Sequence, residues 1–341
     1  MRSKYLGGVL LAGLLSLPSW GTVNPGPNPA QTAQPGTLNY IEGQASLGGQ
    51  ALSTNSVGST EMQAGQTLAT QDGKTEILLT PGVFLRTGPN SSVRMDQPGL
   101  ADTSLTLMKG RAMVEVAEIH KENNLTIRLG GADVRLSERG LYDFDADHNA
   151  VRVFDGKAEI AMGGKTYDVH GGHQFDLMAT KLESRGFDKK AFEDGFYRWG
   201  SLRSSYLAEA NVDQARSYYA GGPGFYGTGW YWDPWYSAYT WIPGDGFFYS
   251  PFGWGFYSPF VVYNSPFFYG YGHFRHAFGP GYRPVVGAFH ARGGSPGFVG
   301  GIRGGGGFQG RAVGGGFHGG GFAGGGFHGG RGGGFHGGGH R

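Results

Sequence analysis

Apolar and polar residues alternate through residues 151–178, which read VRVFDGKAEIAMGGKTYDVHGGHQFDLM. A period of two is what one buried face of a β-sheet requires. Turn residues separate the runs at 155–156, 163–164 and 171–172, and glycine accepts a positive φ there at no steric cost. The pattern predicts short strands joined by tight turns, with a hairpin at Asp155-Gly156. The predicted buried positions are Val151, Val153, Ala158, Ile160, Met162, Tyr167, Val169, Phe175 and Leu177.

The same density of short alternating runs begins near Thr37 and is divided by Pro-Gly, Gly-Pro-Asn and Lys-Gly turns. Many short strands with glycine turns are typical of an all-β fold. We therefore expect an all-β domain over residues 37–180 that folds on its own. Its further predicted strands are 76–80, 83–86, 92–95, 104–108, 112–116, 125–129, 132–136 and 141–144.

One short motif occurs three times in this region. Residues 41–47 read IEGQASL, 108–114 read MKGRAMV and 154–160 read FDGKAEI. Each copy has an apolar residue, then glycine, a long polar residue, alanine and a second apolar residue. The copies are unevenly spaced, so they indicate a β architecture that reuses one bend and not a regular solenoid.

The period changes after residue 186. Phe187, Ala191, Phe196 and Trp199 begin a run at helical spacing that continues to residue 219. Asp188 is a suitable N-cap for the first helix, although the glycines at 195 and 200 weaken it. The predicted unit is a short helical hinge over residues 186–220, with a second short helix from residue 212.

The N-terminus has the form of a secretory signal peptide. Arg2 and Lys4 precede an apolar run that ends at Leu17, and small residues follow. We predict cleavage after Gly21, which makes residues 1–21 the signal peptide and 22–36 a flexible leader rich in Pro and Gly. The apolar run is too short to span a bilayer, and no later segment is long enough, so the mature chain is expected to lack a transmembrane segment.

Residues 221–290 are aromatic and interrupted by Gly and Pro. Large aromatic side chains offer apolar area and, in Trp and Tyr, a polar tip. Two arrangements are physically reasonable: the tryptophans cover a face of the β domain, or they form an interaction surface. We favour the interaction surface, because glycine and proline interrupt the segment too often for dense packing. The candidate interaction residues are Trp230, Trp232, Trp235, Trp241 and Trp254.

Residues 291–341 form a glycine-rich tail with Phe, His and Arg, which we expect to be disordered because too few apolar residues offset the entropy of ordering. The chain has no Asp, Glu or Lys after Asp245, so the tail is basic. Anionic polymers or lipid surfaces fit this charge, whereas export excludes nucleic acid as a partner. Histidines in the tail could bind metal weakly, at the entropic cost of ordering each ligand: His318, His328, His336 and His340.

Candidate chemistry elsewhere is sparse. The chain has no cysteine, which excludes disulfides, thiolate metal sites and cysteine nucleophiles. Asp143, Asp145, Asp147 and His148 could form a metal loop, but they lack the glycine and distal glutamate of an EF-hand and are predicted to be solvated turn residues. His170 and His173 could form a metal-binding pair, but they are likewise predicted to lie in an exposed turn. No nucleophile or phosphate-loop motif is present, so we expect no enzymatic activity and no cofactor.

Four runs in the β region resemble the FecR domain and keep the order of that family's strands. They are residues 65–95, 105–116 (LTLMKGRAMVEV), 140–144 (GLYDF) and 151–160 (VRVFDGKAEI). The resemblance spans residues 40–178 and implies a periplasmic or secreted β module. In the family's namesake this module relays a siderophore-receptor signal through one membrane helix to a cytoplasmic sigma factor. This sequence has no such helix.

These observations predict a compact, many-stranded FecR-like β domain followed by a helical hinge and a largely disordered aromatic and glycine-rich C-terminal region. The expected role is a non-catalytic, exported cell-envelope binding or structural module. The first alternative is a periplasmic signal-sensing module that acts with a separate membrane partner, and the second is weak metal binding through the tail histidines. The expected location is the periplasm or the outer surface of the envelope, with another envelope protein or self-association as further possible contacts.

Overall fold

The computed structural model describes residues 33–219 and 225–265. The predicted signal peptide, most of the leader and the tail lie outside these residues. The described part is mostly β-sheet, as predicted, and its two main sheets face each other. We name the eight-stranded sheet the covered sheet and the nine-stranded sheet the open sheet.

The covered sheet follows chain order from one edge to the other, and the open sheet does so in reverse except that β3 lies outside β2 at its edge. The covered sheet has the order β1 (Leu38–Glu42), β5 (Lys74–Leu78), β6 (Val83–Thr87), β9 (Arg111–Val116), β12 (Gly140–Asp145), β13 (Ala150–Asp155), β16 (His173–Asp176) and β17 (Ser184–Gly186). The open sheet has the order β15 (Lys165–His170), β14 (Lys157–Met162), β11 (Ala132–Leu136), β10 (Asn124–Leu129), β8 (Asp102–Lys109), β7 (Ser92–Pro98), β4 (Thr67–Thr70), β2 (Ala45–Leu47) and β3 (Gln50–Ala51). The chain thus passes back and forth between the sheets as it progresses along them.

The motif that occurs three times in the sequence forms the bend at which the chain crosses between the sheets. Its glycines are Gly43, Gly110 and Gly156, which lie between β1 and β2, β8 and β9, and β13 and β14. Their φ angles are 69°, 73° and 86°, a region that favours glycine. The following alanine of each copy is buried, because it is the first inward residue of the next strand. The predicted hairpin at Asp155-Gly156 is therefore wrong: the turn joins strands of different sheets. Gly163-Gly164 does close a hairpin, between β14 and β15.

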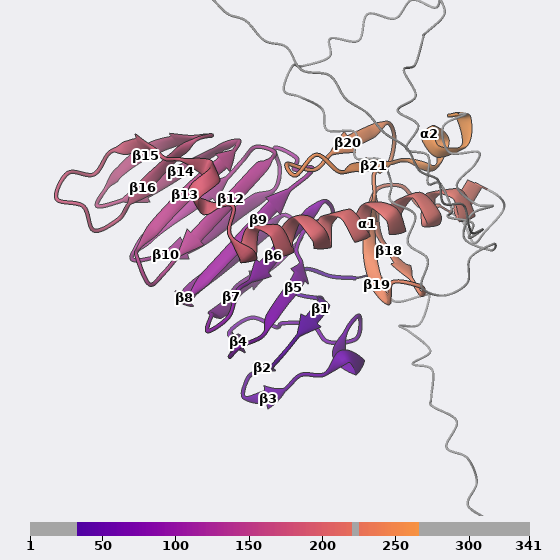
Figure 1. Ribbon diagram of the computed structural model, residues 1–341, viewed down its shortest axis with the longest axis horizontal. Coiled ribbons are helices and arrows are strands. Elements are labelled where there is room, and N and C mark those ends of the chain that lie inside the picture. The colour runs from indigo at the N-terminus through magenta and orange to yellow at the C-terminus, as the bar shows by residue number, and fades with distance from the viewer. Residues whose placement is uncertain (1–32, 220–224, 266–341) are drawn as a thin grey trace, which may run out of the picture. The chain divides into compact units, whose positions relative to one another are not determined.

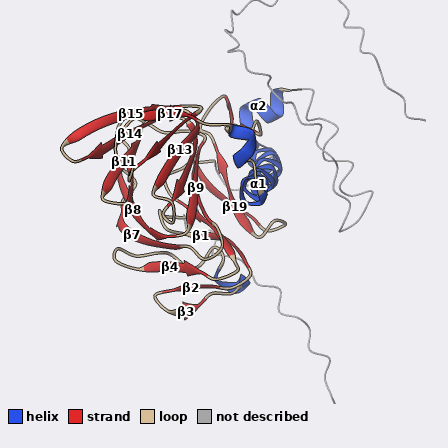
Figure 2. Ribbon diagram, turned by 60° about the vertical axis from the view of Figure 1, so that its left-hand side comes forward, coloured by secondary structure: helices blue, strands red, loops and turns tan. Residues whose placement is uncertain are grey.

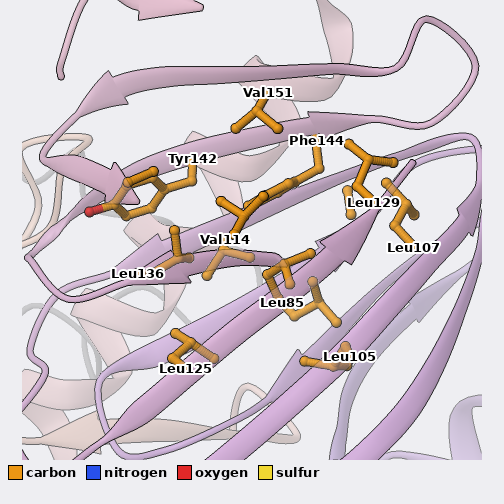
Figure 3. Close-up of a cluster of buried hydrophobic side chains, with 14 of the residues drawn as sticks. Leu85, Leu105, Leu107, Val114, Leu125, Leu129, Leu136, Tyr142, Phe144 and Val151 are labelled. Atoms are coloured by element: carbon orange, nitrogen blue, oxygen red, sulfur yellow. The ribbon is translucent and has the colours of Figure 1, made fainter. Parts of the chain in front are cut away.

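The main core lies between the two sheets (Figure 3). Val114, Tyr142 and Phe144 reach into it from the covered sheet, and Leu105 and Leu125 from the open sheet. Tyr142 also donates its hydroxyl hydrogen bond to the Glu138 carbonyl at 2.7 Å, which satisfies its polar end inside the core. Burial of these apolar faces is the main favourable term in the folding of the sandwich.

The two sheets differ on their other faces. In β10 of the open sheet, Leu125, Ile127 and Leu129 are buried while the residues between them are partly exposed, which is the pattern of a sheet with one solvated face. In the covered sheet, β6 and β12 are buried at every position. Strands buried throughout require cover on both faces, and the C-terminal part of the described chain provides it.

A long helix and two aromatic hairpins form this cover, which we name the C-terminal cover (residues 195–265; Figures 1 and 2). Its elements are α1 (Gly195–Tyr219), β18 (Gly229–Asp233), β19 (Ala238–Ile242), β20 (Phe247–Tyr249), β21 (Gly255–Tyr257) and α2 (Pro259–Asn264). The predicted hinge is a single long helix and not two short ones. Asp188 does act as an N-cap, but for a 3-10 turn at Lys189–Phe192. Asp194 accepts hydrogen bonds from the Phe196 and Tyr197 amides at the start of α1.

Replacing Gly156 by valine tests the shared bend. A Cβ at this position would lie 2.5 Å from the Tyr142 hydroxyl and 2.6 Å from the Arg139 carbonyl, and the φ is positive. We expect Gly156→Val to lower the free energy of unfolding by about 3 kcal/mol or more, measured by urea denaturation. Gly163→Asn is the matched control, because φ is positive there too but the space is open and asparagine tolerates this region. Equal stability of the two variants would refute the steric role of Gly156.

Candidate functional site

The five candidate tryptophans do not share one exposed surface. Trp230 and Trp241 are buried, Trp232 and Trp254 are partly buried, and only Trp235, with 60% of its surface exposed, lies open at the turn between β18 and β19. The prediction that all five line an interaction surface is thereby corrected. Glycine and proline do interrupt the segment, but they form the turns of two hairpins whose alternate residues can still pack.

The covered sheet receives these aromatic residues. The Trp230 indole packs edge-on against Phe84 of β6 with ring centroids 5.1 Å apart, and its Nε1 donates to the Leu79 carbonyl at 3.4 Å. Phe256 stacks on the same Phe84 ring at 6.1 Å and contacts Trp241 at 5.4 Å. A second apolar core therefore forms between the covered sheet and the C-terminal cover.

Charged residues cross the covered sheet in one row beneath the cover. Glu76 pairs across the strands with Arg86, and Arg86 pairs with Met113. Met113 pairs with Asp143, which pairs with Arg152. These side chains point away from the main core. Although a solvated face would normally carry such residues, four of these five positions, all except Arg152, are 0% exposed.

We name the Glu76–Arg86–Glu115–Arg203 group the buried ion cluster. Arg86 Nε lies 2.9 Å from Glu76 Oε2, and Arg86 Nη1 lies 2.5 Å from Glu115 Oε2. Helix α1 completes the cluster, because Arg203 Nη2 lies 2.9 Å from Glu76 Oε1 and Ser204 donates its hydroxyl to Glu115 Oε1 at 2.7 Å. Two carboxylates and two guanidinium groups balance in charge, which is the condition for keeping such groups out of water.

The electrostatics of Glu76 follow from this pairing. Burial by itself would raise the pKa of Glu76, but the charges of Arg203 and Arg86 and their hydrogen bonds outweigh it and hold the pKa below its ordinary value. Glu76 is therefore ionised in the folded protein at neutral pH. The pKa of Arg86 is raised, because the two carboxylates outweigh its burial.

Two asparagines attach the hairpins to the rest of the fold. The Asn39 side chain in β1 accepts from the Tyr239 amide at 2.7 Å and donates to the Tyr239 carbonyl at 3.0 Å. The Asn211 side chain in α1 likewise accepts from the Tyr257 amide at 2.8 Å and donates to the Tyr257 and Trp241 carbonyls. Both residues are fully buried. Each amide satisfies backbone groups of a short strand that would otherwise be unpaired.

The predicted turn acids have another role. Asp143 is fully buried and lies 2.6 Å from Arg111 Nε and 2.9 Å from Arg152 Nη1. Asp145 contacts Arg152 at 3.3 Å and His148 at 2.9 Å. The prediction that these two are solvated is wrong, because β12 is a central strand of a sheet covered on both faces. In residues 33–219 and 225–265, no three His, Cys, Asp or Glu side chains gather in a way that could hold a metal ion. His170 and His173 are exposed, at the crossing between β15 and β16.

Sequence reasoning missed the buried ion cluster. Its signal was present: Glu76, Arg86 and Glu115 each lie next to apolar residues of a strand, at a position that faces away from the main core. The same alternation is expected of a sheet with a solvated face, so the residues of the sandwich alone could not distinguish the two. The deciding residue, Arg203, lies 127 positions after its partner Glu76.

Comparison with known proteins agrees with this architecture. The family model described as FecR protein matches residues 66–159. The chain carries a FecR domain. This domain runs from the start of β4 into β14, so it contains the central strands of both sheets and three members of the buried ion cluster. The C-terminal cover thus packs on the FecR domain and, through the Asn39 side chain, also on β1 outside it.

Two solved structures match part of the chain. They are crystal structures of a "putative anti-sigma factor" from Parabacteroides distasonis, each 16% identical with a TM-score of 0.33. The match covers 38% of this chain and 64% and 65% of theirs, so the chain spans just under two thirds of their length. A search of curated proteins finds no match. Of the helices in the described residues, none combines the length and apolar character needed to cross a membrane.

Ending the chain at residue 180 tests the expectation from the sequence that the β domain folds alone, which the pairing of buried Glu76 with Arg203 opposes. This truncation exposes Leu78, Phe84 and Met113 and leaves Glu76 without Arg203. We expect residues 33–180 to aggregate or to lose cooperative thermal unfolding, whereas residues 33–265 unfold in one transition. Circular dichroism melts of both fragments decide this. A soluble 33–180 fragment with a sharp transition would show that the cover is dispensable.

Replacing Glu76 by glutamine tests the buried ion cluster. The change keeps the shape but leaves Arg86 and Arg203 with one carboxylate fewer, so we expect the free energy of unfolding to fall by about 3 kcal/mol at pH 7. Glu183→Gln is the control, because Glu183 forms its ion pairs at the surface and should show no measurable change.

Acidification adds a second test of the same variant. A carboxyl group with a lowered folded pKa stabilises the fold above its ordinary pKa of 4.5, and this contribution is lost as the pH falls through the folded value. The difference in stability between the wild type and Glu76→Gln should therefore narrow below about pH 4.5. A difference that stays constant on acidification would contradict the ionised state of Glu76.

Proposed function

We propose that this chain is a non-catalytic signal-sensing module, exported to the periplasm or the outer face of the envelope, that acts with a membrane partner. The FecR domain at residues 66–159 is the observation that carries the proposal. Proteins with this domain are regulatory and not catalytic, and they act with membrane proteins. The sequence pattern by itself favours an envelope-binding or structural role, whereas the domain match favours the sensing role.

The surface available to such a partner is the solvated face of the open sheet. The C-terminal cover occupies the outer face of the other sheet. On the open sheet, Asp96 accepts hydrogen bonds from Arg94 and Arg128 at 2.8 Å each, and Arg128 Nε also lies 3.2 Å from Asp133. Arg94, Asp133 and Arg135 are exposed. A partly exposed ladder of both charge signs supports specific recognition of a protein surface more than tight binding to a polyanion.

A truncation after residue 265 separates sensing from attachment by the tail. The truncated chain keeps every described element, whereas a cut at residue 220 would remove hairpins that pack on the FecR domain. We expect deletion of the gene to change the transcript levels of a limited set of genes, and residues 1–265 to restore them. If restoration requires residues 266–341, the envelope-binding role of the tail becomes the better account.

A charge-reversal variant tests whether restoration of the transcript levels depends on the open sheet. Arg94→Glu combined with Arg135→Glu should abolish restoration while the purified protein still unfolds cooperatively, with at most a small fall in melting temperature from the lost exposed Arg94–Asp96 pair. Lys121→Glu combined with Lys181→Glu is the control, since both lysines are exposed outside this ladder. Full restoration by the arginine variant would exclude this face as the contact with the partner.

A further inference from the structure

The hairpin β20–β21 has an aromatic face on each side. Phe248 and Phe256 pair across the strands and face the core, where they lie 5.3 Å and 5.4 Å from the Trp241 ring. The opposite face should carry polar residues, because a hairpin with one buried face is normally polar on the other. It carries Phe247, Tyr249 and Tyr257 instead, of which Phe247 is exposed, Tyr249 is partly buried, and Tyr257 is partly buried beside the cluster that includes Ile242 and Val262. This outward aromatic face has no role in the packing of the FecR domain.

The outward rings lie side by side. Phe247 is 47% exposed, and its ring centroid lies 5.7 Å from that of Tyr249 and 6.3 Å from that of Tyr257. Gly255 is the strand partner of Tyr249, and the Tyr257 ring lies over it, where a Cβ would collide with the Tyr257 hydroxyl. The absence of a side chain at Gly255 therefore makes room for the Tyr257 ring, whereas the Phe247 and Tyr249 rings meet edge to face, at 80° to each other.

Helix α2 extends the surface. It starts beside the hairpin, because the Ser258 amide donates to the Gly246 carbonyl at 3.0 Å. Pro259 and Val262 face inward, whereas Phe260 and Tyr263 occupy its outer side and are 68% and 49% exposed. Residues at i and i+3 lie on the same side of a helix, so both rings lie on one side of α2. Together with the three hairpin rings we name them the aromatic strip.

The strip is uncharged. Residues 246–264 contain no Lys, Arg, Asp or Glu, and the exposed Asp245 borders them. An anionic polymer or an anionic lipid surface would require cations here, and an acidic border opposes both. Flat aromatic rings with tyrosine hydroxyls at their edges match a partner whose own faces are apolar and whose rim is hydroxylated. Sugar rings have this form, because their axial C–H groups make apolar faces and their hydroxyls point sideways.

We propose that Phe247, Tyr249, Tyr257, Phe260 and Tyr263 form a binding platform for an uncharged polysaccharide. Sugar units stack on the exposed rings of Phe247 in the hairpin and of Phe260 and Tyr263 in α2, and the other two rings border them. The platform belongs to the C-terminal cover and not to the open sheet, so it does not depend on the proposed sensing role.

The test uses the full mature chain with two soluble neutral probes, a chitin hexasaccharide and a β-glucan. The variant Phe247→Ser with Phe260→Ser should weaken binding at least about tenfold, because both rings are exposed anchors of the platform. Leu100→Ser with Met178→Ser is the control and should bind as the wild type does, since these apolar residues are exposed on the sandwich. The conservative variant Phe247→Tyr with Phe260→Tyr should keep the affinity.

Three results would overturn the platform. The wild-type chain could fail to bind either probe, or the serine variant could bind as tightly as the wild type. In the third case no variant affects sugar binding, but the serine variant changes another property. It no longer binds uncharged phosphatidylcholine vesicles, or it no longer forms a concentration-dependent dimer that sedimentation detects for the wild type. That result would assign the strip to a lipid surface or to a second copy of the chain.

Discussion

Charge neutralisation beneath helix α1 is the constraint on which the rest of the structure depends. Glu76, Arg86 and Glu115 are fully buried on the face of the covered sheet that points away from the main core. An unpaired charge there would cost several kcal/mol, so the sheet is stable only with a matching partner above it. Arg203 supplies the missing positive charge, and Ser204 supplies a hydroxyl donor to Glu115. The aromatic hairpins exclude water around these pairs and bury the apolar residues of the same face.

The cover is adapted to this face in its backbone as well as its side chains. Gly200 weakens an isolated helix, yet a Cβ there would lie 3.3 Å from Met113 Sδ and 3.6 Å from Arg86 Cδ. Glycine therefore permits α1 to lie directly on the charged row. The fold is in this sense a sandwich with a third layer, in which the FecR domain provides the central strands of the two sheets and the chain from residue 195 provides the cover. The sites left for partners are the solvated face of the open sheet and the outer side of the cover.

Much of the sandwich could be predicted from the sequence, because period-two alternation and glycine turns are local signals. Strands such as β10 and β11 lie where the alternation placed them, and the repeated glycine motif does mark a repeated bend. Relations between distant residues could not be predicted. A glycine turn does not show in the sequence whether the two strands that it joins belong to one sheet or to two. For this reason the sequence predicts a hairpin at Asp155-Gly156, where the chain crosses between sheets. The burial of Trp230 and Trp241, like that of Glu76, depends on which surface lies opposite. That surface can be distant along the chain: Asn39 and Tyr239, which are in contact, are 200 residues apart.

Native-state hydrogen exchange on residues 33–265 tests most directly whether the FecR domain and its cover form one folding unit. Amides of β6, β9 and β12 should exchange only through global unfolding, and amides of α1 around Arg203 and of β19 should exchange with the same free energy and the same denaturant dependence. If α1 and β19 exchange through a separate opening of much lower free energy while the covered sheet stays protected, the charges beneath the helix tolerate water and the cover is an independent appendage.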